Sequence, residues 1–401
     1  MTIEIRTPAA DDLRAAMEAT HIVFADPLTD DQYERQRKLL RLDRFYAAYE
    51  DGIPVGTAAD YEFRLTGPGG ELAAGGVTWV GVLPSHRRRG ILTQLMRREL
   101  VDIHERGEPL AVLWASEAAI YGRFGYGMAA PHMVMDADRA RFALRDDPGA
   151  EGRVRIVPLD DALESCMHVY EAVRPTIAGF VDRSAEVWSL ARLADPEEWR
   201  RGSSPKYAAI VELDGAPAAY AIYRIKQDWQ RGFSRSSVKL VETMAVGAVA
   251  ERELWRFVFG IDLIERVNGR VDPASPLLLM VVDARSLHLN VTEGLWLRLV
   301  DVGAALAGRS FANDDAIVIG VRDEFCPWNA GRWRVGREVA RTDDDAELEL
   351  DVADLASAYL GAFSFTRLGA ADRVRELKDG ALARADALFR TERAPYCPED
   401  F

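Results

Sequence analysis

Three arginines followed by a glycine, Arg87-Arg88-Arg89-Gly90, give the clearest chemical signal in the sequence. Residues 77–83 before them are β-branched and apolar, as in a buried strand, and Pro84 ends that run. After Gly90 the apolar residues recur at helical spacing up to residue 103. A strand that enters a helix through such a turn presents free backbone N–H groups to an anion, and arginines can close over phosphates. The segment therefore predicts a phosphate-binding turn.

The spacing Arg87-x-x-Gly90-x-Leu92 resembles the acetyl-CoA signature of the GCN5-related N-acetyltransferases (GNAT), although that signature has a small residue in place of Leu92. Residues 113–127, LWASEAAIYGRFGYG, resemble the corresponding stretch of the enhanced-intracellular-survival (Eis) acetyltransferases. In that family HRRRG followed by a leucine is normal, so Leu92 fits. On these two motifs the chain is identified as a member of the Eis family.

The resemblance covers the whole chain and implies an α/β (α+β) fold with three domains. Residues 1–149 would form the GNAT acetyltransferase domain, and residues 150–292 a second GNAT-like domain without activity. Residues 293–401 would form a domain like the sterol carrier proteins. The family also implies assembly into a homohexamer. The order of expected strands and helices in the second part echoes the first, which is a weak internal repeat.

The resemblance implies an acetyl-CoA site in the first domain and no metal. Backbone N–H groups of Val80 and Val82 are expected to meet the pantetheine and the acetyl carbonyl, and Ser116 is expected to add a contact. The phosphates are expected at the turn and helix start, formed by Arg87, Arg88, Arg89, Gly90, Ile91 and Leu92.

The second domain tests whether this site is repeated. Its equivalent stretch, residues 240–251, contains no Arg-x-x-Gly. Glu251 and Glu253 lie near the expected helix start, where negative charge would repel a phosphate. We therefore predict one acetyl-CoA site per chain.

Acetyl transfer needs an acid for the departing sulfur and a base for the attacking amine. The resemblance assigns the acid to Tyr126, which two glycines flank, and a tyrosine keeps its proton at neutral pH. No Asp, Glu or His of the first domain stands out by spacing as the base. In Eis proteins the C-terminal carboxylate serves, and that role falls here to Phe401. An α-carboxylate is a weak base in water, and an apolar environment would strengthen it.

The resemblance places Phe24 and Asp26 in the acceptor pocket, with Glu399 and Asp400 beside the terminal carboxylate. Together these carboxylates would form a negative pocket suited to polycationic amines. The predicted reaction is direct acetylation of aminoglycosides or polyamines, without an acyl-enzyme. Two alternatives stay open: acetylation of protein or peptide lysines, and a CoA- and lipid-binding scaffold without turnover.

Composition excludes other classes of protein. The formal charge of −14, from 50 basic and 64 acidic residues, argues against a nucleic-acid binder. No apolar run reaches the length of a membrane span, and the N-terminus has no signal-peptide pattern. The three distant cysteines indicate reduced thiols rather than a disulfide framework. These features predict a cytoplasmic protein without a membrane span.

Periodicity predicts most elements, and four expectations in the second half of the chain depend on ambiguous apolar runs. These are a helix over residues 250–267, a strand over 277–282, a helix over 295–306 and a helix over 370–390.

Overall fold

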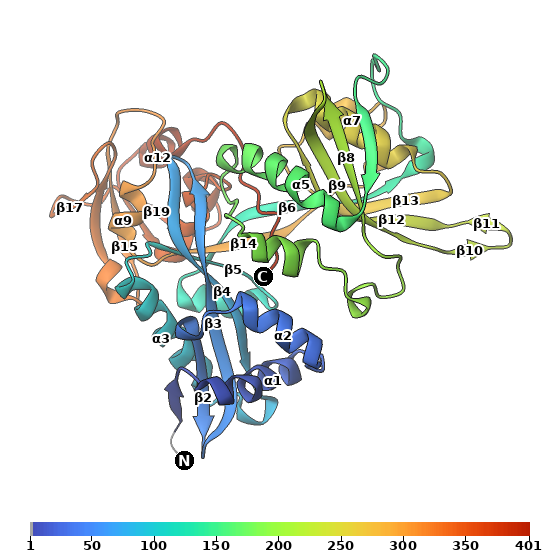
Figure 1. Cartoon of the computed structure of the whole chain (residues 1–401). Helices are drawn as coiled ribbons and strands as arrows, with labels where there is room; N and C mark the ends of the chain where they lie inside the picture. Colours follow the sequence, from blue (N-terminus) through green and yellow to red (C-terminus); the bar gives the residue numbers. More distant parts are fainter. Residues whose placement is uncertain (1–2) are drawn as a thin grey trace. The chain divides into compact units, whose positions relative to one another are not determined.

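The computed structural model describes residues 3–401, which divide into two compact units (Figure 1). The first unit contains residues 3–130, 294–395 and 399–401. The second unit contains residues 131–293 and 396–398. The first and third predicted domains therefore form a single unit, while the boundaries at residues 149 and 292 stay predictions.

The sheet of the first unit is a meander with a parallel strand beside it. Its order is β1 (Glu4–Arg6), β2 (Phe45–Glu50), β3 (Ile53–Gly67), β4 (Gly70–Val82), β5 (Leu110–Trp114) and β14 (Asn290–Leu299, of which 294–299 belong to this unit). Neighbours from β1 to β4 are antiparallel, β5 is parallel to β4, and β14 is antiparallel to β5. Asp51 and Gly52 both have positive φ, which confirms the predicted hairpin turn between β2 and β3.

Two helices cover opposite faces of this sheet because β2 is apolar on both faces. Phe45 and Ala47 pack with Ala16 and Met17 of α1 (Leu13–Val23). The alternate residues of β2 pack with Ile91 and Leu95 of α3 (Ile91–Glu105). Each fully buried large side chain contributes roughly 1.5–3 kcal/mol, so α3 is held firmly behind the strand that leads into it.

The C-terminal part of the first unit has its own sheet. Its strands lie in the order β17 (Ala340–Arg341), β16 (Gly331–Val335), β15 (Ile317–Arg322), β18 (Leu348–Asp351) and β19 (Val374–Glu376). Its helices are α9 (Val302–Ala307), α10 (Val352–Tyr359), α11 (Phe365–Gly369) and α12 (Ala381–Phe389). The buried guanidinium of Arg309 donates to the carbonyl oxygens of Tyr359 (2.9 Å), Ser310 (2.7 Å) and Phe389, which ties these helices together.

The second unit repeats the architecture of the first sheet. Its order is β6 (Gly127–Asp138, of which 131–138 belong to this unit), β13 (Ile264–Val271), β12 (Ser236–Ala245), β9 (Ala216–Lys226), β8 (Tyr207–Leu213) and β7 (Arg153–Val157). β12 is parallel to β13 and antiparallel to β9. Helices α5 (Leu159–Val173) and α7 (Gly247–Gly260) pack in two separate cores with this sheet. A small hairpin, β10 (Trp229–Gln230) with β11 (Phe233–Ser234), extends from the strands (Figure 1).

Two predictions in the second unit are wrong. The expected helix over residues 250–267 ends at Gly260, and β13 follows it. Ile264, Val267 and Val271 are buried at helix-like spacing, but pairing with β12 on one side and β6 on the other makes the segment a strand. The expected strand over residues 277–282 begins as the short helix α8 (Leu277–Met280), because four apolar residues fit a buried helical turn as well as a strand.

Two predictions in the first unit are also wrong. The expected helix over residues 295–306 is β14 as far as Leu299, and α9 starts only after Asp301 caps it. The expected helix over residues 370–390 is interrupted by β19, and α12 begins after Gly380. Gly380 is in the left-handed region, which separates the two elements.

Candidate active site

β4 and β5 separate at the point where the predicted cofactor strand begins. The two strands pair only at Ala74, Gly75 and Gly76 of β4, with residues 110–112 of β5. From Val77 onward β5 no longer pairs with β4, so backbone groups on that edge of β4 need another partner. Val80 and Val82 lie on this stretch and are half-buried. The gap can hold an extended ligand that bonds to a strand edge.

A β-bulge marks the same stretch of β4. Trp79 has a φ of +54°, and the register between β3 and β4 shifts opposite it. The Thr57 hydroxyl donates to the Trp79 carbonyl oxygen at 2.7 Å, and the hydroxyls of Thr20 and Thr57 are hydrogen-bonded. These bonds hold a backbone conformation that an L-residue rarely adopts, and such strain concentrates at functional sites.

The predicted phosphate turn links β4 to α3. Arg88 and Gly90 both have positive φ, and Gly90 is the residue before the helix. The first helical bond runs from Gln94 N–H to the Gly90 carbonyl, which leaves the N–H groups of residues 91–93 directed out of the helix. Residues 87–90 are all exposed. This geometry fits an anion such as a phosphate.

Arg89 is held from the side by β2. Its guanidinium bonds to the Glu50 carboxylate, and His86 Nε2 lies 2.8 Å from the same group. Bonds from Arg89 and His86 lower the pKa of Glu50 to about 2, so the pair is charged at neutral pH. Arg89 therefore braces the turn, while Arg87 and Arg88 extend their charges from it.

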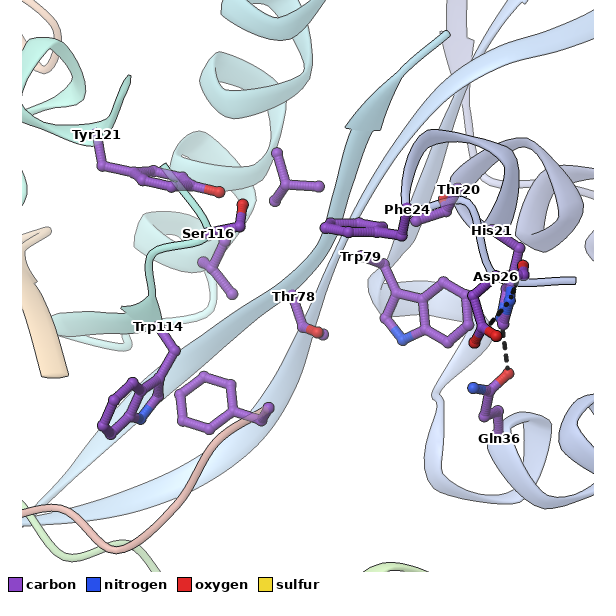
Figure 2. A pocket seen from close by; sticks show the side chains of 13 residues that line it. Thr20, His21, Phe24, Asp26, Gln36, Thr78, Trp79, Trp114, Ser116 and Tyr121 are labelled. Carbon is purple, nitrogen blue, oxygen red and sulfur yellow. Dashed lines mark hydrogen bonds and ion pairs between the residues drawn. The ribbon is translucent and has the colours of Figure 1, made fainter. Parts of the chain in front are cut away.

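A pocket of about 340 Å³ opens beside the bulge, and we call it the central pocket (Figure 2). Its lining residues are Thr20, His21, Phe24, Asp26, Gln36, Val77, Thr78, Trp79, Val80, Trp114, Ser116, Tyr121 and Phe401. Five predicted site residues thus meet here: Phe24, Asp26, Val80, Ser116 and Phe401.

Other predicted residues lie elsewhere. Glu399 is buried and Asp400 is exposed, and neither lines the central pocket. Val82 and residues 87–92 belong to the strand end, the turn and the helix start instead.

The C-terminal residue is docked on the first unit. The Phe401 ring lies 5.0 Å from the ring of Phe63 and 6.5 Å from that of Tyr61, both edge-on, and both partners belong to β3. Such aromatic pairs contribute about 0.5–1.5 kcal/mol each beyond their buried area. Phe401 therefore lines the central pocket, and the rest of that pocket comes from residues 20–121.

The structure does not bring Tyr126 into the central pocket. Its side chain is fully buried in the core, and its hydroxyl has no hydrogen-bond partner among the described residues. The tyrosine that lines the pocket is Tyr121, on the short helix α4 (Ala118–Tyr121), and its hydroxyl lies beside Ser116 in Figure 2. The two rings pack edge-to-face with centroids 6.0 Å apart.

Tyr121 and Tyr126 belong to the same family-like segment, residues 113–127. Gly125 ends a helical turn and Gly127 begins β6, and Tyr126 lies between them in the core. Tyr121 stands on α4 and lines the central pocket.

The sequence also did not indicate the residues that form the pocket wall opposite Tyr121. His21, Gln36 and Trp79 line the central pocket, and no spacing pattern in the sequence distinguishes them. They come from α1, α2 (Asp30–Leu39) and β4, so only the tertiary fold brings them together.

The second unit fills the equivalent place with its own side chains. Its β12 has a register shift between Leu240 and Glu242, like the bulge of β4. The buried Glu242 carboxylate accepts from Arg183 at 2.9 and 2.5 Å and from the Tyr220 hydroxyl at 2.5 Å. Burial opposes ionisation, but Arg183 and Arg192 keep the pKa of Glu242 at about 2.

The helix start of the second unit differs from the expectation in one respect. α7 begins at Gly247, so Glu253 lies in its second turn and is buried beside Arg256 (3.3 Å) instead of facing an anion. The missing arginines, rather than Glu253, therefore distinguish this turn from the one at residues 87–90.

The described residues offer neither a cluster of metal ligands nor a membrane-spanning helix. Among residues 3–401, no group of three or more His, Cys, Asp or Glu side chains is arranged to hold a metal ion. No helix within that range is long and apolar enough to cross a membrane.

A strand pair that separates at a bulge and leads into an arginine-glycine helix start defines the class of GNAT-type N-acetyltransferases. Residues 4–129 and residues 179–299 each match a family model described as an acetyltransferase (GNAT) domain. Residues 302–398 match a model described as a sterol carrier protein domain.

Relatives that match nearly the whole chain identify the family within this class. An uncharacterized N-acetyltransferase of Streptomyces avermitilis is 40% identical over 100% of both chains. The N-acetyltransferase Eis of Mycobacterium tuberculosis is 32% identical over 98% of both chains. The crystal structure of Eis1 from Mycobacterium abscessus matches with a TM-score of 0.87 and 32% identity over 100% of both chains. The chain therefore belongs to the Eis family of N-acetyltransferases, which confirms the predicted family and fold class, and GNAT enzymes take their acetyl group from acetyl-CoA.

Proposed function

We propose that this enzyme acetylates amino groups of small polycationic molecules, aminoglycosides or polyamines, by direct transfer from acetyl-CoA. The observation that supports the acceptor class most strongly is the charge of the central pocket. Asp26 and Phe401 both line it, the described lining residues include no lysine or arginine, and a carboxylate at Phe401 would be its second negative charge. A concave site with one sign of charge concentrates ligands of the opposite sign.

Acetyl-CoA, when bound, supplies an acyl group activated as a thioester. The residues present fit it, because the open edge of β4 offers backbone groups at Val80 and Val82 for an extended amide-bearing arm. The N–H groups of residues 91–93, with Arg87 and Arg88, offer a phosphate site. Ser116 lines the central pocket together with Val80.

The terminal carboxylate of Phe401 is the proposed base. An amine arrives protonated and must lose a proton before its nitrogen can attack the acetyl carbon. The carboxylate takes that proton, the new C–N bond forms, and the C–S bond breaks. The nitrogen loses a second proton after the attack, and the sulfur gains one proton from a second group, so that one proton in all is released to solvent for each amide formed.

Tyr121 is the proposed acid, in place of Tyr126. Burial, with Glu99 and Glu117 nearby, raises the pKa of Tyr121 to about 12, so its hydroxyl is protonated at neutral pH. It lines the central pocket beside Ser116, whereas the Tyr126 hydroxyl is enclosed in the core. A group that protonates the leaving sulfur must reach the site, and Tyr121 meets that condition.

Matched tyrosine variants test this assignment. Tyr121→Phe should lower kcat by about 10²- to 10⁴-fold with little change in the KM for acetyl-CoA. Tyr126→Phe removes a hydroxyl of the same kind from the core behind it and should keep most of the activity. Release of the CoA thiol, measured with a panel of aminoglycosides, polyamines and lysine peptides, gives the readout. Loss of activity in Tyr126→Phe alone would return the acid to that residue, and turnover with lysine peptides only would replace the proposed acceptor class.

A further inference from the structure

The charges around the acceptor wall of the central pocket are unevenly distributed. His21 and Asp26 line the central pocket and also an adjoining outer hollow of about 370 Å³. The outer hollow is lined by Glu18, His21, Ile22, Ala25, Asp26, Pro27 and Leu28. Among the described residues that line either space, His21 is the only one whose side chain can become positive.

His21 is bonded on both sides of its ring. It lies near the end of α1 and is almost fully buried. Its Nδ1 is 2.9 Å from the carbonyl oxygen of Asp26 and 3.7 Å from the carboxylate Oδ2 of the same residue. Its Nε2 is 3.3 Å from the side-chain oxygen of Gln36 (Figure 2). The ring also packs against Trp79 at a centroid distance of 5.6 Å.

This geometry accommodates two protonation states of the imidazole. Both ring nitrogens face oxygen atoms, so a protonated ring donates to both. A neutral ring donates from Nδ1 alone, and a half-turn of the Gln36 amide then presents its NH₂ group to Nε2. His21 can therefore gain or lose charge without losing its place.

We propose that His21 sets the net charge of the acceptor site and thereby its preference between diamines and monoamines. When His21 is neutral, Asp26 and the terminal carboxylate leave two negative charges for two ammonium groups. When it is protonated, its charge offsets that of Asp26, and one negative charge remains. His21 is thus a positioning and specificity-determining residue that acts through Asp26, and the inference rests on the proposed function of the pocket.

Among the groups that face His21, Asp26 is the one whose charge a protonated His21 would offset. On α1, Glu18 borders the outer hollow, and Arg14 binds it at 3.2 Å. Gln36 on α2 and Trp79 on β4 carry no charge. From the C-terminal tail, Phe401 lines the same central pocket. Asp26 is the group within ion-pair distance of the ring.

The test compares two amines so that their own ionisation cancels. The ratio of kcat/KM for 1,4-diaminobutane to that for butylamine is measured at about pH 6 and about pH 8, where both amines stay protonated and a histidine ordinarily changes charge. In the wild-type enzyme the ratio should rise on the order of 5-fold toward higher pH. His21→Gln cannot be protonated and should give a ratio that is high and constant.

Two further variants separate the charge of His21 from that of Asp26. Asp26→Asn should lower the ratio at both pH values, and adding His21→Gln to Asp26→Asn should remove the pH dependence that remains. The KM for acetyl-CoA should stay the same in all variants. A pH-independent ratio in the wild-type enzyme would overturn the proposal, as would a pH dependence that persists in His21→Gln. If neither these amines nor an aminoglycoside is acetylated at all, the proposed function fails instead.

Discussion

At the scale of single residues, Gly125 shows how the segment with the two tyrosines is fixed. Its φ is +82°, and a Cβ placed on it would lie 2.7 Å from Cζ and 2.8 Å from Nε of Arg298. Arg298 is fully buried and ion-paired with Asp323 at 2.6 Å. The C-terminal part of the first unit thus packs directly behind the turn that follows Tyr121.

Gly125→Ala should destabilise the protein by about 2–4 kcal/mol, because it combines a left-handed backbone with displacement of a buried, paired guanidinium. Denaturant unfolding measures the loss. Gly122→Ala is the matched control in the same turn, since a Cβ there meets open space, and its free energy of unfolding should stay within about 0.5 kcal/mol. Equal losses in both variants would contradict this view of the turn.

Some residues of the candidate site could not be predicted from the sequence alone. The resemblance pointed to Tyr126 and to Phe401, and of these two only Phe401 lines the central pocket. The sequence could not indicate that Tyr121 lines the pocket while Tyr126 is buried in the core, because burial depends on how the segment packs. Likewise His21 is ordinary as a sequence feature and becomes informative only through Asp26 and Gln36.

At the scale of elements, α3 carries a carboxyl group in the middle of its buried face. Glu99 is fully buried, and its neighbours Met96, Leu100 and Ile103 form the apolar stripe that packs on the sheet. Both Glu99 oxygens lack hydrogen-bond partners among the described residues. Burial, with Asp60 and Asp102 nearby, raises the pKa of Glu99 well above its usual value. Burial on this helix therefore favours the neutral form of Glu99.

Because folding raises the pKa of Glu99, we expect the free energy of unfolding to fall as pH rises. Burial also raises the pKa of Asp60 to about 6, against the opposing effect of Arg106 and Arg44. Because the folded state binds these protons more tightly than the unfolded chain, their contribution is complete below the ordinary carboxyl pKa and is lost as pH rises through the raised values. The expected loss in the free energy of unfolding is on the order of 2 kcal/mol.

Glu99→Gln should flatten this pH dependence while keeping the wild-type stability near pH 5 to within about 1–2 kcal/mol. Urea unfolding across the range measures both quantities. Glu105→Gln, an exposed change on the same helix, should leave the wild-type curve unchanged. A wild-type stability that increases with pH above neutrality would show that Glu99 is ionised in the folded state.

Elements were predictable where periodicity and boundaries agreed. The strand over residues 207–213 and the helix after Gly90 follow their patterns closely. The segments at residues 264–271 and 290–299 did not, because their apolar residues are mixed with polar ones and follow no strict alternation. Only the neighbouring strands β6 and β5 decide between a strand and a helix.

At the scale of the whole molecule, the proposed mechanism requires that Phe401 reaches a pocket formed otherwise by residues 20–121. Residues 20–121 build most of the central pocket, and Phe401 completes it from a tail without helix or strand. A base at the terminus would make activity depend on the length of the chain, since an added residue would move the carboxylate beyond Phe401, whose ring packs on Tyr61 and Phe63. No side-chain base would have that property.

The most direct measurement is therefore the rate of CoA release with a polyamine acceptor for the wild-type chain and for a chain extended by one glycine after Phe401. We expect that the extended protein folds, binds acetyl-CoA with an unchanged KM and loses about 10²- to 10⁴-fold in kcat. An extended protein with full kcat would contradict the role of the terminal carboxylate and, with it, the proposed mechanism.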